Sequence, residues 1–251
     1  MTNYLFKIAR NKFFNISIRS LFSKLYYTYK KIKLIKYRSK NKFDFDWNSL
    51  NYNRTALLNY IISCNSKKYN TSYLEIGCQN NLNFNAICLK DKIGVDPDIG
   101  GNLRMTSDQF FKQNKLKFDL IFLDGLHTYE QTKKDLLNAI EVLNDEGVIV
   151  LDDFIPRNWK EHLTPRVQTN WNGDIWKIAF ELVKSNGIDF RIIKIDGGQC
   201  VIFKDKRKYF IPDLYMQNKD LDFDYLFENF NKLPVIELDS GLKWIIEKLN
   251  G

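Results

Sequence analysis

The chain has 251 residues, of which 44% are hydrophobic and 15% aromatic; this composition excludes an intrinsically disordered chain and allows one α/β domain with a sizeable core. The formal net charge is +8, but residues 1–42 hold twelve Lys or Arg and no Asp or Glu. Removing those twelve positive charges from +8 leaves −4, so the sequence predicts a mildly acidic body with a basic arm.

The cysteines and the N-terminus indicate the compartment. The four cysteines form no CxxC pair and the chain has two histidines, which argues against a zinc site built on thiolates. No apolar run reaches transmembrane length, and the N-terminus lacks the apolar core and cleavage site of a signal peptide. We therefore expect reduced cysteines in a cytoplasmic protein.

The basic arm and its linker occupy residues 1–46. Apolar residues recur near helical spacing over residues 3–35, with basic residues between them, which predicts one or two amphipathic helices. Three interpretations stay open: the arm lies on an anionic membrane surface at the inner face, docks on a partner protein, or packs on its own domain. Nothing in it resembles a base-reading module, so nucleic acid is not expected as a partner.

A strand–turn–helix–strand unit follows a helix expected over Trp47–Ser63. The unit comprises a strand at Tyr73–Ile76, a turn at Gly77–Asn81, a helix at Leu82–Leu89 and a strand at Ile93–Val95 that ends in Asp96. Such a turn presents backbone N–H groups and a helix N-terminus to a ligand, and Asp96 can accept hydrogen bonds from ribose hydroxyls. The unit therefore suits a nucleotide-like ligand.

Alternating strands and helices continue through residue 154. The segment Thr106-Ser107-Asp108 is expected to form the N-cap of a short helix that carries Phe110 and Phe111. The almost wholly apolar run Phe118–Asp124 predicts a strand buried on both faces. A helix over Thr128–Leu143, a turn at residues 144–147 and a buried strand at Val148–Leu151 follow. The alternation predicts an α/β, Rossmann-like, mostly parallel sheet with helices on both faces.

The remaining residues are expected to add a lid and an edge. Residues 155–174 are polar and irregular, as binding loops often are. A helix over Asp174–Ser185 precedes two strands, Phe190–Ile195 and Gln199–Lys204, which form an antiparallel edge around the turn at residues 196–198. The boundaries are therefore an arm at 1–46, a domain at 47–204 and a C-terminal extension at 205–251 that packs on the domain and ends in a helix near Ser240–Leu249.

Acidic residues follow two neighbouring strands of the expected sheet. Asp124, Asp152 and Asp153 would converge at its carboxyl edge, where open α/β sheets bind ligands. Either they hold a divalent cation such as Mg²⁺ or Mn²⁺, which oxygen ligands favour over zinc, or Asp152 or Asp153 caps the following segment. His127 either takes a proton from a hydroxyl or has a structural role.

The lid carries residues that suit a carbohydrate. Trp171 offers an aromatic face to a sugar ring, and Asn172 and Asp174 offer polar groups to its hydroxyls. The alternative is that tryptophans of this segment pin a loop to the core.

The ordered motifs resemble class I S-adenosylmethionine-dependent methyltransferases. The pieces that carry the resemblance are LEIGC (74–78), GVDPD (94–98), TSDQFF (106–111), FDLIFLDGLHTYEQ (118–131) and GVIVLDDF (147–154). DGLHTYE, with PR (165–166) and WNGDIWK (171–177), is similar to methyltransferases encoded with bacterial surface-polysaccharide genes. The resemblance covers roughly residues 47–204.

This resemblance implies roles by position. Glu75 and Gly77 would lie on the methionine and ribose side of the cofactor, Asp96 at the ribose, Ser107 or Asp108 near the adenine, and Asp124 at the reaction centre. The turn residues Cys78 and Asn80 belong to the expected cofactor set as well. The turn departs from the usual glycine-rich pattern, but Asn80 or Asn81 can adopt the left-handed conformation it requires. A nicotinamide cofactor is disfavoured, because the spacing GxGxxG is absent.

The expected activity is O-methylation of a sugar or surface-glycan precursor, in which His127, Asp124 or Asp153 removes the hydroxyl proton. Two alternatives stay open: a non-sugar acceptor such as a phosphate-like or phosphoramidate group, and a non-catalytic protein that kept the fold. The chain is also expected to permit a homo-oligomer.

Overall fold

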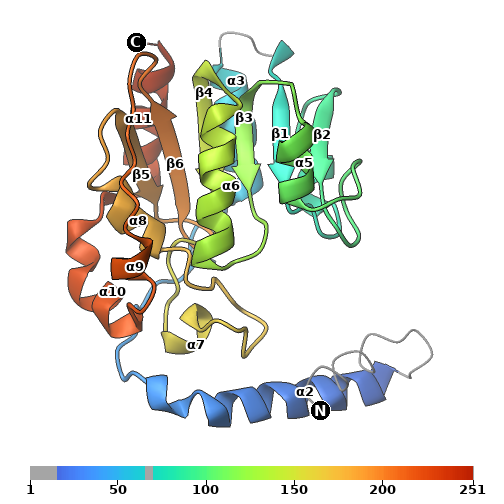
Figure 1. Ribbon diagram of the computed structural model, residues 1–251, viewed down its shortest axis with the longest axis vertical. Coiled ribbons are helices and arrows are strands. Elements are labelled where there is room, and N and C mark those ends of the chain that lie inside the picture. The colour runs from blue at the N-terminus through green and yellow to red at the C-terminus, as the bar shows by residue number, and fades with distance from the viewer. Residues whose placement is uncertain (1–15, 66–69, 251) are drawn as a thin grey trace.

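The structure, a computed structural model, describes residues 16–65 and 70–250. Its centre is a seven-stranded sheet in the order β2-β1-β3-β4-β6-β5-β7 (Figure 1). The strands are β1 (Tyr73–Ile76), β2 (Lys92–Val95), β3 (Phe118–Leu123), β4 (Leu143–Leu151), β5 (Ile188–Ile193), β6 (Gln199–Lys204) and β7 (Val235–Ile236).

The strand directions confirm the predicted Rossmann-like sheet. β1 to β4 are parallel to one another, whereas β6 is antiparallel to both β4 and β5. The antiparallel strand is not the outermost one, because β7 of the C-terminal extension pairs parallel with β5 and forms the edge. The sequence predicted that the pair of strands now seen as β5 and β6 would form the edge of the sheet. The C-terminal extension instead adds β7 beyond them, a strand that its polar and aromatic sequence did not indicate.

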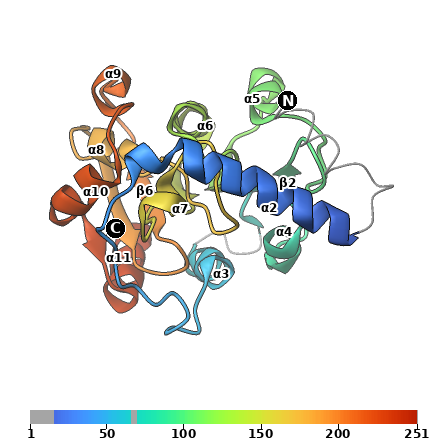
Figure 2. The same ribbon diagram turned by 90° about the horizontal axis from the view of Figure 1, so that it is seen from below.

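Helices cover both faces of the sheet (Figure 2). One face carries α5 (Ser107–Gln113), α6 (Tyr129–Glu141) and α8 (Lys177–Leu182); the other carries α3 (Arg54–Cys64), α4 (Leu82–Ala86) and α11 (Leu238–Asn250). β3 is buried along its whole length and alternates between the two layers: Ile121 and Leu123 belong to the first core, Leu120 and Phe122 to the second.

Several element ends differ from the sequence expectation. α3 begins at Arg54 rather than Trp47, because Asn53 caps it by accepting from the Ala56 N–H at 3.0 Å. The turn expected at residues 144–147 lies inside β4, where the register with β3 shifts between Phe118 and Leu120. The cap expected at Thr106 is confirmed as a capping box with Gln109.

The arm and the lid lie below the carboxyl edge of the sheet. α2 (Ile16–Lys33) runs under it, with the lid and its short helix α7 (Trp159–His162) in between (Figures 1 and 2). A 3₁₀ turn, η1 (Ile35–Tyr37), ends the arm. The part of the prediction that concerns residues 1–15 lies outside the described residues. None of the helices in residues 16–65 and 70–250 is long and apolar enough to cross a membrane.

The linker and the extension pack against each other. Phe43 lies among the rings of Phe223, Phe227 and Phe230, at 4.5–5.8 Å between ring centroids. The Phe43 N–H donates to the Arg157 carbonyl at 2.8 Å, which ties the linker to the lid. The extension's other elements are α9 (Tyr215–Asn218), α10 (Phe223–Asn229) and η3 (Phe230–Lys232).

Candidate active site

The candidate site lies where β1, β3 and β4 end side by side. Ile76 is opposite Leu123, and Leu123 is opposite Leu151, so Gly77, Asp124 and Asp152 follow neighbouring strand ends. A cavity of about 1040 Å³ opens there. Its walls run from the turn after β1, past the ends of β2 and β3, to the lid.

The turn after β1 needs one glycine and two other residues with positive φ. Gly77 has φ +89°, and a Cβ there would lie 2.0 Å from the Asp124 carbonyl oxygen. Gln79 (φ 45°) and Asn81 (φ 64°) take left-handed conformations, and the Asn81 Oδ1 accepts from the Gly101 N–H at 2.7 Å. Asn81 therefore makes the turn as one of the two expected asparagines, while Asn80 accepts from the Leu82 N–H at the start of α4.

Asp96 holds this turn against the end of β2. One carboxylate oxygen accepts from the Cys78 N–H at 3.1 Å and the Gln79 N–H at 2.8 Å; the other accepts from Asp98 and Ile99 at 2.8 and 3.0 Å. Burial alone would raise the pKa of Asp96, but these four N–H donors outweigh it and lower the pKa. Asp96 is thus a fixed carboxylate in the cavity wall, and its bond to a ribose stays a prediction.

Three of the expected cofactor residues do not line the cavity. Glu75 is buried under α4, where it accepts from the Tyr73 hydroxyl at 2.6 Å and from Asn83 at 2.8 Å, and burial raises its pKa to about 7. Cys78 is buried, and Asn80 is exposed at the head of α4. The cavity wall at this turn comes from Gly77 and Gln79 instead, because a left-handed residue redirects the side chains that follow it.

The expected adenine end is built by α5 and α6. Ser107 and Asp108 line the cavity, as do Gln131 and Asp135, which the sequence did not single out. The Gln131 amide donates to Asp135 at 3.0 Å, to Asp108 at 3.1 Å and to Ser107 at 3.3 Å. Burial raises the pKa of Asp135 to about 6. The helical spacing of Gln131 and Asp135, one turn apart, is the sequence signal that could have found them.

Asp124, His127 and Asp153 meet at the centre of the cavity. The His127 Nε2 lies 3.0 Å from Asp124 Oδ1, and Nδ1 lies 3.1 Å from Asp153 Oδ2 and 3.2 Å from the Trp171 carbonyl. Burial would lower the pKa of His127, but the hydrogen bonds and charges of Asp124 and Asp153 raise it to about 10. His127 is therefore an imidazolium held between two carboxylates at neutral pH.

Arg54 is the functional residue that the sequence reading missed. Its Nη1 pairs with Asp152 and lies 3.0 Å from Asp124 Oδ2, and its Nε lies 2.9 Å from Asp196 Oδ2. Arg54 is the first residue of α3, where a cation is unfavourable because the helix dipole is positive there, and the first turn carries no acid. That conflict was the available signal that α3 starts beside clustered carboxylates.

The cluster corrects the expected metal ligands. Asp152 is 1% exposed, does not line the cavity, forms an ion pair with Arg54 and accepts a hydrogen bond from Gln199. Within residues 16–65 and 70–250, the group of three ligand atoms close enough for a cation is Asp124, His127 and Asp153, all within 4.8 Å of one another. Two carboxylates and an imidazole fit Mn²⁺ or Mg²⁺ as a donor set once His127 has released its proton, because only a neutral imidazole binds a metal ion. His127 takes the place of Asp152 because Arg54 neutralises the latter.

The lid residues divide between the cavity and the scaffold. Trp171 and Asn172 line the cavity: the Trp171 ring stacks on His127 (5.3 Å between centroids, 14° between planes), and the Asn172 amide donates to Asp153 at 2.9 Å. Asp174, expected at the substrate, instead accepts from the Tyr129 N–H at 2.8 Å and pairs with Lys177 at 3.0 Å. It stabilises the start of α6, because a carboxylate favours a helix N-terminus.

Comparisons with known proteins identify the segment that contains most of this site. Residues 63–154 match the model of a methyltransferase domain family. No curated protein matches the chain by sequence. Among solved structures, the methyltransferase PaMTH1 of Podospora anserina, solved with SAH, is 17% identical (TM-score 0.46) over 61% of this chain and 78% of its own.

A second similar structure is the O-methyltransferase TomG of Streptomyces achromogenes in complex with SAM. It is 9% identical (TM-score 0.42) over 60% of this chain and 80% of its own. The matched residues 63–154 include the turn after β1, Asp96, Asp124, His127 and Asp153. The motifs that predicted a methyltransferase lie largely within these matched residues.

Proposed function

We propose that the protein transfers a methyl group from S-adenosylmethionine to a hydroxyl of a sugar or surface-glycan precursor. The observation that carries the proposal is the continuity of one cavity. It is lined at one end by Gln79, Asp96 and Asp108 and at the other by His127 and Trp171. The first end suits an adenosyl group and the second an acceptor, so donor and acceptor meet at Asp124.

The chain's own residues would align the two substrates and take up a proton. S-adenosylmethionine, when bound, supplies an electrophilic methyl group. The acceptor oxygen forms a bond to the methyl carbon as the carbon–sulfur bond breaks, and the hydroxyl proton must leave. His127 already holds a proton between Asp124 and Asp153, so the next proton goes to a carboxylate oxygen of this group.

The aromatic wall supports a carbohydrate acceptor. The Trp171 indole N–H donates to the Leu163 carbonyl at 2.7 Å, which holds its ring in the cavity wall. An aromatic ring that is fixed in the wall offers an apolar contact to a sugar, and Asn172 beside it offers polar atoms to hydroxyls. A divalent cation that displaces the His127 proton and binds Asp124, His127 and Asp153 would lower the pKa of the acceptor hydroxyl.

Two measurements test the proposal. Calorimetry with S-adenosylmethionine should detect binding in the wild type, and absence of binding would leave a non-catalytic protein with a methyltransferase fold. Incubation with candidate sugars and sugar nucleotides should give a product heavier by one methyl group. Methylation of a phosphate-like group in the same assay would contradict the sugar hydroxyl as acceptor and support the alternative acceptor.

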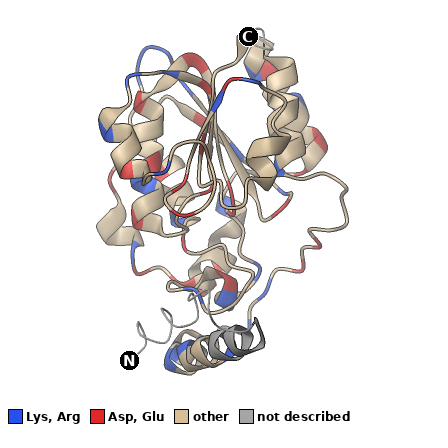
Figure 3. Ribbon diagram, turned by 90° about the vertical axis from the view of Figure 1, so that its right-hand side faces the viewer, with Lys and Arg blue, Asp and Glu red and all other residues tan. Residues whose placement is uncertain are grey.

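We also propose that α2 rests on an anionic membrane surface of the cytoplasm. Leu25, Tyr29 and Ile32 are exposed (56%, 52% and 66%) and follow one another by four and three residues, so they share a face of the helix. Figure 3 shows basic and uncharged residues in the described part of α2 and no acidic ones. An apolar stripe flanked by cations suits anionic lipid headgroups.

Vesicle sedimentation tests this second proposal. A variant with Leu25, Tyr29 and Ile32 all replaced by Ser should pellet less with vesicles that contain phosphatidylserine than the wild type does. Replacement of the exposed Leu116, which lies between α5 and β3, is the matched control. Equal pelleting of wild type and triple variant would remove α2 from this role.

A further inference from the structure

Among the described residues, the acceptor end of the cavity contains one arginine that no carboxylate neutralises. Arg54 is paired with aspartates, and Arg157 is paired with Glu161 at 2.9 Å. Arg166 lines the same cavity, yet in the described part of the chain it has no ion pair. Its Nε donates to the Gln168 carbonyl at 2.8 Å, and its Nη2 donates to the Thr169 carbonyl.

These two backbone bonds fix the Arg166 guanidinium without cancelling its charge. Carbonyl oxygens carry only partial charges, so the cation keeps a net attraction for an anion. The side chain is half-buried, and the conformational entropy of an arginine side chain is already lost before a ligand arrives. A preorganised arginine with unused N–H donors commonly binds phosphate or carboxylate groups.

Arg166 also stands at a defined place relative to the reaction centre. Its guanidinium lies over the Trp171 ring, 5.7 Å from the centroid, and the other neighbour of that ring is His127, at 5.3 Å. Arg166 and His127 therefore both lie against Trp171 in the cavity wall. A sugar in the cavity beside Trp171 can place a hydroxyl near His127 and a substituent near Arg166.

The carboxylates at the acceptor end of the cavity restrict where an anionic group can bind. Asp124, Asp153, Asp196 and Glu161 all line the acceptor end and repel negative charge, even where each is paired. An anionic substituent is therefore favoured beside Arg166, whose charge no carboxylate of the described residues neutralises. This polarity would set the direction in which an acceptor enters and so decide which hydroxyl meets the methyl group.

We propose that the acceptor is an anionic sugar whose phosphate or carboxylate pairs with Arg166 while a hydroxyl faces His127. The proposal rests on the methyl-transfer function proposed above and narrows its substrate class. It separates phosphorylated or acidic sugars from neutral ones, and the source of the charge is decided by experiment.

The experiment uses the full chain and small anions as probes. Inorganic phosphate and acetate are titrated calorimetrically into the wild type, Arg166→Gln, Arg166→Lys and the control Arg207→Gln, an exposed arginine outside the cavity. We expect Arg166→Gln to weaken phosphate binding at least about ten-fold, Arg166→Lys to weaken it less, and Arg207→Gln to leave it unchanged. A stronger response to acetate than to phosphate would assign the site at Arg166 to a carboxylate.

The overturning result is a wild type that binds neither anion, or anion binding that survives Arg166→Gln. Titration of S-adenosylmethionine into the same four proteins separates this result from failure of the methyl-transfer proposal. Cofactor binding without Arg166-dependent anion binding refutes the anionic acceptor alone. Arg166-dependent anion binding without cofactor binding refutes methyl transfer and leaves an anion site.

Discussion

Arg54 is predicted to contribute to stability mainly through Asp152. Asp152 is almost fully buried, and Arg54 is the cation that neutralises it. Replacement of Arg54 by Gln would leave that carboxylate charged and buried, or force it to take up a proton. Removal of one partner from a buried pair costs about 3–5 kcal/mol, more than the pair itself contributes, because the other charge stays desolvated.

The companion variant Asp152→Asn should be milder. It removes the buried charge, and Arg54 keeps Asp124 at 3.0 Å and Asp196 at 2.9 Å. We expect it to lower the free energy of unfolding by about 1–2 kcal/mol, the contribution of a hydrogen bond to a charged group. The double variant should then be more stable than the sum of the single effects predicts, by about 2 kcal/mol or more.

Urea unfolding of the four proteins measures this coupling directly. Lys206→Gln is the control, because Lys206 pairs with Glu146 on the open surface and its loss should leave the urea midpoint unchanged. Single effects that add to within about 0.5 kcal/mol would refute the reasoning, since they would show that Asp152 does not depend on Arg54 for its charge.

Three further predictions concern the cavity and the strand beneath it. His127→Gln should lower kcat at least about 100-fold while S-adenosylmethionine affinity, measured by calorimetry, stays within about two-fold of the wild type; undiminished turnover would contradict the catalytic role. Gly77→Ala, whose Cβ would lie 2.0 Å from the Asp124 carbonyl oxygen, should weaken S-adenosylmethionine binding about ten-fold or more, and unchanged affinity would contradict the described turn. Burial raises the pKa of Glu75 from 4.5 to about 7, so the folded state holds this proton more tightly than the unfolded state does. The contribution of Glu75 to the free energy of unfolding is therefore fully present below pH 4.5. It is lost as the pH rises through 7, by about 3 kcal/mol in total. Urea unfolding of Glu75→Gln across this range should lack that component, and identical pH profiles for the two proteins would disprove it.

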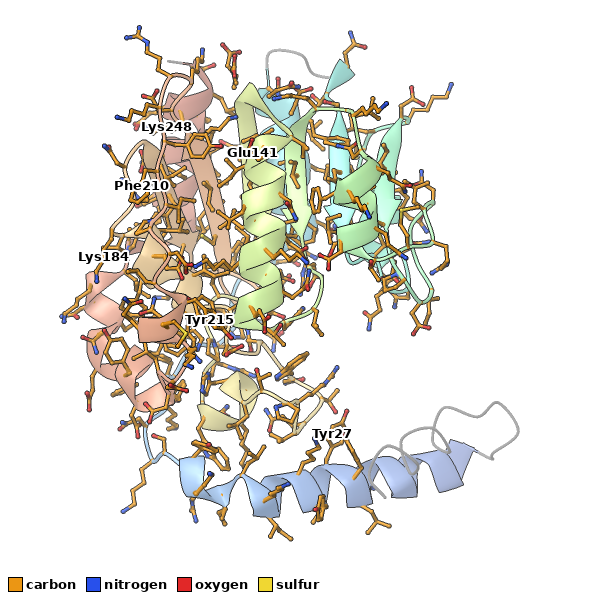
Figure 4. The ribbon with its side chains drawn as sticks, in the orientation of Figure 1. Tyr27, Glu141, Lys184, Phe210, Tyr215 and Lys248 are labelled. Carbon is orange, nitrogen blue, oxygen red and sulfur yellow. The ribbon has the colours of Figure 1, made fainter. Side chains whose placement is uncertain are left out.

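The arm lies next to the lid, which forms part of the acceptor end of the cavity (Figure 1). Tyr27 extends from α2 toward the lid segment (Figure 4). The lid residues Trp171 and Asn172 contact His127 and Asp153. The lid therefore lies between the arm and the acceptor end of the cavity. The membrane and acceptor proposals can therefore be tested together, by repeating acceptor binding with and without vesicles.

Local patterns in the sequence determined the elements and the part of the site that follows strand ends. β3 is apolar except for Asp119 and is buried on both faces, and parallel strands end at one edge, so Asp124 and Asp153 could be placed near each other from the sequence alone. The turn after Gly77 could be placed for the same local reason, since few residue types accept its backbone angles.

The tertiary structure alone decided which carboxylates are available to a ligand. Arg54 and Asp152 are far apart in sequence, and their pairing removes Asp152 from the cavity and leaves His127 between Asp124 and Asp153. Glu75 likewise turns away from the cavity because Tyr73 and Asn83 satisfy it inside the core. The spacing of residues in the sequence indicates where a strand ends. The orientation and charge of a side chain depend on partners from distant segments, which only the fold brings into contact.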